Sequence, residues 1–153
     1  MYTAKAFFSN FVLVSTISAW FVAQFLKMVT TLIKEKKFKP SLMLFSSGGM
    51  PSSHSATVGS LCTSSAIAFG FGSFEFAVSA VLSMVVITDA MGVRWETGEQ
   101  SKVINKIVKK LFAGKPEDAE TALKELVGHT PLQVLMGVIV GVVTPFILAI
   151  WMR

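Results

Sequence analysis

The sequence predicts an all-α integral membrane protein, a single domain over residues 1–153 in which about four transmembrane helices form a bundle. Apolar residues make up 52% of the chain, charged residues only 15%, and the mean hydropathy is +0.63. A soluble chain of this length and composition would expose large apolar patches to water. Each helical crossing needs roughly 20 apolar residues, so the length has room for about four. A soluble fold is therefore disfavoured.

The first two spans are expected at residues 7–33 and 55–71. Residues 7–26 carry no charge and are rich in Phe, Val, Leu and Ile. A cluster of Gly, Ser and Pro at residues 46–53 breaks any helix, so residues 34–53 are expected to form a loop. The second span is charge-free but rich in Ser, Thr, Ala and Gly, which favours close packing at the centre of the bundle.

The third and fourth spans are expected at residues 74–93 and 131–152. Asp89 lies near the end of the third span, where a carboxylate is costly in hydrocarbon and must face protein, water or a cation. The last span contains Gly137 and Gly141, a spacing typical of close helix packing within a bundle or between subunits. We expect these glycines to serve packing within the bundle. Assembly into a homo-oligomer stays an open alternative.

A polar insertion over residues 94–130 separates these two spans. Over residues 102–112, apolar residues recur at helical spacing opposite lysines, which is typical of a basic amphipathic helix in the headgroup zone. Such a helix could instead pack on the protein's own core. Pro116 and Gly128 favour a second short helix over residues 116–127.

The basic residues predict the orientation of the chain in the membrane. The two polar segments between spans hold four and seven basic residues, whereas the opposite side holds only Lys5 and Arg153. Because positively charged loops stay in the cytoplasm, we expect both segments there, with the spans in the plasma membrane of a bacterium. The bases lie beside spans rather than among exposed aromatics, so anionic headgroups or phosphate are better partners than nucleic acid.

The sequence contains no sign of a metal or an organic cofactor, and none is expected. Cys62 is the single cysteine, which excludes a disulfide framework and a Cys-rich metal site. No P-loop, dinucleotide fingerprint or metal-ligand cluster is present, so any chemistry must be assembled by folding.

Three groups able to bind phosphate fall at or near span boundaries on one face of the membrane, namely His54, Arg94 and His129. His54 follows Ser52 and Ser53 at the expected start of a helix, where backbone N–H groups and hydroxyls form an anion cradle. A lone histidine at a membrane boundary is more often a hydrogen-bonding anchor than a catalyst. The residues alone therefore leave both roles open.

Two short motifs and four longer segments carry a family resemblance. The motifs are Pro-Ser-Ser-His at residues 51–54 and His-Thr-Pro-Leu-Gln-Val at residues 129–134. The longer segments are residues 34–38, 47–55, 89–94 and 123–131. In these residues the sequence resembles the phosphatidic acid phosphatase type 2 superfamily, and most closely its small divergent family, also described as acid phosphatase/vanadium-dependent haloperoxidase-related.

The resemblance implies hydrolysis of a phosphomonoester or a pyrophosphate through a phosphohistidine intermediate. It makes His129 the nucleophile and His54 the general acid that protonates the leaving oxygen. In this reading Lys34 or Lys39 stands in for the superfamily's first basic motif. The candidate phosphate-binding residues are Arg94, Ser52, Ser53, Lys34 and Lys39.

Gln133 departs from the superfamily, which has an aspartate at this position to orient the nucleophilic histidine. A neutral amide can accept the imidazole N–H but cannot stabilise imidazolium as a carboxylate does. Asp89 or Glu125 could supply the missing charge, although Asp89 could equally pair with a lysine or bind water. Two functions stay open: a membrane phosphatase acting on a lipid phosphate or another phosphate ester, and a non-catalytic scaffold, binder or carrier of lipid phosphates.

Overall fold

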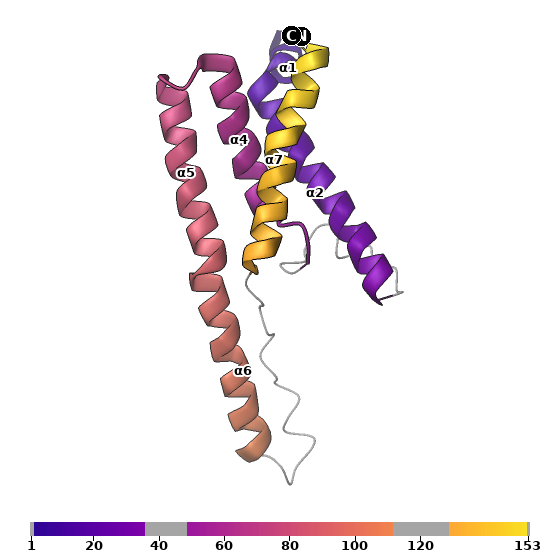
Figure 1. Ribbon diagram of the computed structural model, residues 1–153, viewed down its shortest axis with the longest axis vertical. Coiled ribbons are helices and arrows are strands. Elements are labelled where there is room, and N and C mark those ends of the chain that lie inside the picture. Colours follow the sequence, from indigo (N-terminus) through magenta and orange to yellow (C-terminus); the bar gives the residue numbers. More distant parts are fainter. Residues whose placement is uncertain (1, 36–48, 112–128, 153) are drawn as a thin grey trace.

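The computed structural model describes residues 2–35, 49–111 and 129–152, which are α-helical apart from short turns (Figure 1). Within these residues no strand occurs, which confirms the all-α prediction. Three stretches of the described chain are long and apolar enough to cross a membrane, Phe11–Ile33, Phe74–Val108 and Pro131–Met152. The helices are α1 Tyr2–Ser9, α2 Phe11–Glu35, α4 Ser53–Phe69, α5 Phe74–Met91, α6 Val93–Leu111 and α7 Pro131–Met152.

Asn10 divides the N-terminal helical region into α1 and α2. Its side-chain oxygen accepts a hydrogen bond from the backbone N–H of Leu13, at 3.0 Å. An asparagine in this position caps a new helix. The long helix therefore begins at Phe11, later than residue 7, where the sequence places the start of the first span.

The helix α4 lies at the centre of the bundle, in contact with α2, α5 and α7. Its buried residues are almost all small, five of them serines, so neighbouring backbones approach closely. This agrees with the central position expected for residues 55–71. At 17 residues, however, α4 is shorter than the three candidate spans and ends at Gly70, whose φ of +87° suits glycine.

Gly137 and Gly141 form the contact surface of α7 toward α4. A Cβ atom at Gly137 would overlap the carbonyl oxygen of Ser52, and one at Gly141 would lie 2.5 Å from the carbonyl oxygen of Ala56. The two glycines therefore serve packing within the bundle, as expected. This contact holds the first half of α7 against the first half of α4.

The helix α6 continues almost directly from α5, with only Gly92 between them, and extends beyond the other helices (Figure 1). The expected amphipathic helix therefore begins at Val93 rather than near residue 102. The apolar residues Val103, Ile104 and Ile107 are 44% to 55% exposed, so the described part of the chain does not bury them in a core. The second short helix expected at residues 116–127 lies outside the described residues.

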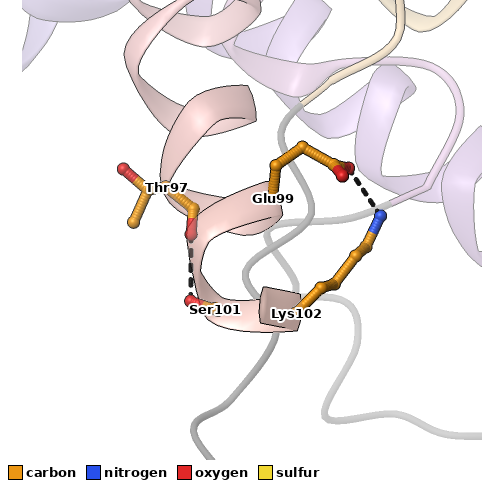
Figure 2. Close-up of polar contacts among 4 residues, drawn as sticks. All are labelled: Thr97, Glu99, Ser101 and Lys102. Atoms are coloured by element: carbon orange, nitrogen blue, oxygen red, sulfur yellow. Dashed lines mark hydrogen bonds and ion pairs between the residues drawn. The ribbon is translucent and has the colours of Figure 1, made fainter. Parts of the chain in front are cut away.

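Short-range polar contacts hold the first half of α6 together (Figure 2). The Lys102 ammonium pairs with the Glu99 carboxylate at 2.7 Å, and the Ser101 hydroxyl donates to the Thr97 carbonyl oxygen at 2.9 Å. An exposed ion pair of this kind contributes at most about 1 kcal/mol. It offsets one positive charge on the basic face of α6.

Candidate functional site

The start of α4 holds His54 in a helix turn that serine side chains cap. Ser52 is the N-cap, and its hydroxyl oxygen accepts hydrogen bonds from the backbone N–H of Ser55 at 3.3 Å and from the Ser55 hydroxyl at 3.0 Å. Serine is favoured at this position because its oxygen satisfies a backbone donor that the helix leaves unpaired. Ser52 and Ser53 are buried, whereas His54 is exposed at the end of the bundle.

The start of α7 places an acceptor directly behind His129. The Thr130 hydroxyl oxygen accepts from the Gln133 N–H at 3.4 Å, and the Gln133 side-chain oxygen Oε1 accepts from the Thr130 N–H at 3.1 Å. This reciprocal pair is a capping box, which fixes the orientation of the Gln133 amide. The same oxygen lies 3.3 Å from Nδ1 of His129.

The contact with Gln133 selects one tautomer of the His129 ring. Since the Gln133 oxygen already accepts from a backbone N–H, it acts as an acceptor toward Nδ1, which then carries the proton. We assign this proton from the hydrogen-bond pattern. Nε2 is then the unprotonated nitrogen of the ring.

The tertiary structure brings the two histidines together although they lie far apart in the sequence. The ring centroids of His54 and His129 are 6.0 Å apart. Two backbone hydrogen bonds position the segments: Ser52 N–H donates to the Gln133 carbonyl oxygen at 3.0 Å, and His129 N–H donates to the Ala90 carbonyl oxygen at 3.3 Å. The ends of α4, α5 and α7 therefore meet at this pair, and His129 is only 3% exposed.

The structure describes only some of the other candidate site residues. Asp89 is half-buried in the last turn of α5, one residue before the Ala90 carbonyl that bonds His129. Arg94 is the second residue of α6 and Lys34 lies near the end of α2, but their side chains lie outside the described part of the structure. Lys39 and Glu125 fall in segments outside the described residues. The expected convergence of Arg94 with the histidines thus stays a prediction.

Lys27 and Thr30 of α2 contact residues 49 and 50, just before the start of α4, and the sequence did not predict either contact. Lys27 is only 2% exposed, and its Cγ would lie 3.1 Å from a Cβ at Gly49. The Thr30 hydroxyl donates to the Met50 carbonyl oxygen at 2.6 Å. Gly49 has a φ of +102°, which favours glycine, and the Met50–Pro51 peptide bond is cis. A single lysine within an apolar run was the signal that could have found this contact.

Within the described residues, no group of three or more His, Cys, Asp or Glu side chains could hold a metal ion. Cys62 is a half-buried free cysteine on α4.

The apolar helices and the two imidazoles at one end of the bundle indicate the class of this chain: a helical membrane protein with a pair of histidines at one end. Residues 8–144 match the model of the Divergent PAP2 family, and the chain belongs to that family. It is 39% identical over 151 residues to a Bacillus subtilis (strain 168) protein named uncharacterized membrane protein YuiD, covering 92% of this chain and 95% of the relative. No solved structure matches significantly. The family expected from the motifs is thus confirmed.

Proposed function

We propose that this protein is a membrane phosphatase that hydrolyses a lipid phosphate, or another phosphate monoester or pyrophosphate, through a phosphohistidine at His129. The observation that carries the proposal is the pairing of His54 with His129, at 6.0 Å between ring centroids, with the Gln133 oxygen behind Nδ1 of His129. One imidazole is oriented as a nucleophile, and the other lies close enough to act on the same phosphate. A lipid substrate suits a site at the end of a membrane bundle.

In the proposed reaction, Nε2 of His129 attacks phosphorus and the bond from phosphorus to the leaving oxygen breaks. His54, as imidazolium, gives its proton to that oxygen. Water then attacks the phosphohistidine, with neutral His54 accepting a proton from the water, and phosphate leaves as the His129 lone pair is restored. The N-terminal end of α4, where the helix dipole is positive, favours the negative charge of the phosphate oxygens.

A phosphate-release assay on the purified protein in lipid nanodiscs tests the proposal. The panel contains lipid phosphates, a water-soluble phosphomonoester and pyrophosphate, each with a protein-free nanodisc control. We expect release from at least one of these substrates. Binding without release from any of them would contradict hydrolysis and favour the second candidate, a non-catalytic binder, carrier or scaffold for lipid phosphates. The specific observation favouring that candidate is the neutral Gln133 amide behind His129.

Restoring a carboxylate behind His129 tests the significance of Gln133. Gln133→Asp should preserve or raise hydrolysis, because a carboxylate stabilises the imidazolium character that His129 gains during turnover. Gln133→Ala should lower the rate, since the ring loses its acceptor. The initial rate of phosphate release measures both effects. A large loss in Gln133→Asp would mean that the amide has a role of its own in a site that binds phosphate without cleaving it.

Asp89 is proposed to supply the negative charge that Gln133 lacks. If it does, Asp89→Asn should lower the rate more than Gln133→Ala, because the isosteric amide removes charge while keeping shape. The same assay compares the two variants. If Asp89→Asn hydrolyses substrate at the wild-type rate, the charge of Asp89 has no role in hydrolysis, and the residue is only a polar group at the end of the span.

The orientation of the site is proposed to be cytoplasmic, with both termini outside. Single cysteines at positions 3 and 117 in a Cys62→Ser background report it through a membrane-impermeant thiol reagent applied to intact cells. We expect labelling at position 3 only, because basic segments stay in the cytoplasm. Labelling at position 117 in intact cells would reverse the assignment, and labelling of both in permeabilised cells is the control.

A further inference from the structure

A cavity of about 480 Å³ lies between α2, α4 and α5, at the end of the bundle remote from the two histidines. The α4 residues that line it begin at Leu61 and end at Phe69, which follows His54 by about 22 Å along the helix axis. Figure 1 shows the end of α4 and the start of α5 at the same end of the molecule as both termini. The cavity is therefore separate from the two-histidine site.

The cavity occupies a space that the helices leave open toward the membrane. The helices α2 and α5 each pack on α4 but make little contact with each other, and the cavity lies between them. Val78 and Leu82 of α5 line it and are 49% and 45% exposed. In a bilayer, such a side of an apolar helix faces hydrocarbon, so lipid has access to the cavity.

Two polar side chains, Asn10 and Glu75, mark one end of this cavity, which we call its mouth. Asn10 is exposed just before α2, and Glu75 is exposed in the first turn of α5. The Asn10 oxygen Oδ1 accepts from the Leu13 backbone N–H at 3.0 Å, so the amide nitrogen is the end of this side chain that can donate to a ligand. The mouth thus offers a carboxylate and an amide donor where two apolar helices begin, the depth of lipid headgroups.

The wall becomes apolar with depth. Leu82 follows Glu75 by two turns of α5, about 10 Å along the helix, and Leu61 lines the cavity from α4. A polar mouth above an apolar wall of this depth matches a molecule with a polar head and a hydrocarbon chain.

The hydroxyl groups in the wall do not alter this apolar character. The Thr16 hydroxyl donates to the Val12 carbonyl oxygen at 2.8 Å, and the Ser79 hydroxyl donates to the Phe76 carbonyl oxygen at 2.9 Å. Both hydroxyl protons are therefore satisfied within their own helices. Ser65, the third hydroxyl residue of the wall, is only 3% exposed.

We propose that this cavity binds a phospholipid with an ammonium headgroup, of the phosphatidylethanolamine type, with one acyl chain between α2 and α5. The lipid ammonium pairs with the Glu75 carboxylate, and the Asn10 amide donates to an oxygen of the lipid head. The chain lies against Leu61, Val78 and Leu82, where it gains dispersion contacts and joins two helices that hardly contact each other. The proposal does not depend on phosphatase chemistry at the other end of the bundle.

Lipid-dependent thermal stability of the full-length protein in detergent micelles tests the choice of headgroup. Phosphatidylethanolamine, phosphatidylglycerol and diacylglycerol with the same acyl chains are titrated separately, since a ligand of the folded state raises Tm with its concentration. Phosphatidylethanolamine should act at a concentration at least about threefold lower than either other lipid, because it alone brings an ammonium to Glu75. Equal concentrations for phosphatidylethanolamine and diacylglycerol would overturn the proposal.

Glu75→Gln tests the ion pair with the lipid head. The variant keeps the shape of the side chain and removes its charge, so the preference for phosphatidylethanolamine over diacylglycerol should disappear. Glu96→Gln is the matched control, because Glu96 is also exposed in the first turn of a helix, and it should keep the preference. A preference that persists in Glu75→Gln would contradict the assignment of Glu75.

Val78→Trp tests the path of the acyl chain, since the larger side chain fills the cavity and should remove the rise in Tm with phosphatidylethanolamine. Val81→Trp, on the same helix at a site that is 65% exposed and does not line the cavity, should respond as the wild type does. An unchanged response in Val78→Trp would place the lipid elsewhere and overturn the proposal. Native mass spectrometry of the wild type should show a monomer with bound phosphatidylethanolamine, whereas a lipid-free dimer would overturn it in favour of a second copy of the chain.

Discussion

Replacing His129 with alanine is expected to lower hydrolysis by at least about a thousandfold, because the variant has no nucleophile to carry the phosphoryl group. Two contacts that position the start of α7 do not use the ring and are kept in this variant: the Thr130 and Gln133 capping box, and the backbone bond from residue 129 to Ala90. The initial rate of phosphate release measures the loss. Rapid quenching with labelled substrate should trap a phosphohistidine in the wild type and none in His129→Ala.

The His54→Ala variant tests the proposed general acid. Since His54 is proposed to protonate the leaving oxygen, its loss should matter greatly for an alkyl phosphate and much less for an aryl phosphate whose leaving group needs no proton. His129→Ala should abolish hydrolysis of both. An unchanged rate in His129→Ala would remove the proposed nucleophile, and equal losses for the two substrates in His54→Ala would remove the proposed acid.

Replacing Gly137 with valine is expected to destabilise the bundle by about 1–3 kcal/mol or more and to separate the histidine pair. The Cβ of the new side chain would overlap the Ser52 carbonyl oxygen and lie 2.9 Å from the Ser55 Cβ, at a position where backbone faces backbone. The helix α7 must then move away from α4. The hydrogen bond from Ser52 to Gln133 and the contact between the imidazoles both depend on that packing.

Thermal unfolding in nanodiscs and the phosphate-release rate measure the two effects of Gly137→Val. Gly72→Ala is the control, because a Cβ at Gly72 meets no atom within 4 Å and should change neither quantity. Gly141→Ala should lower Tm as well, since its Cβ would lie 2.5 Å from the Ala56 carbonyl oxygen. A normal Tm in Gly137→Val would mean that α4 and α7 do not pack as described.

The composition and the apolar runs of the sequence determined the fold class of this protein, and its motifs determined the family. Long uncharged stretches can only be buried as helices in a bilayer, so their lengths predict α2, α5 and α7 without tertiary information. Small residues in α4 predicted its central position, and the spacing of Gly137 and Gly141 predicted close packing. The motifs that contain His54 and His129 predicted the family, which the family model confirms.

Only the tertiary structure decided which side chains share the site and what holds them. The capping box shows that Gln133 orients His129 while it closes the first turn of α7, two roles that its departure from aspartate obscured. Lys27 lies in an apolar run, where hydropathy predicts a span and says nothing of which face turns inward. Its contact with Gly49 arises from the path of a loop between two helices. Local patterns encode helices and caps because these depend on neighbours in the chain, whereas a site built from four segments depends on their packing.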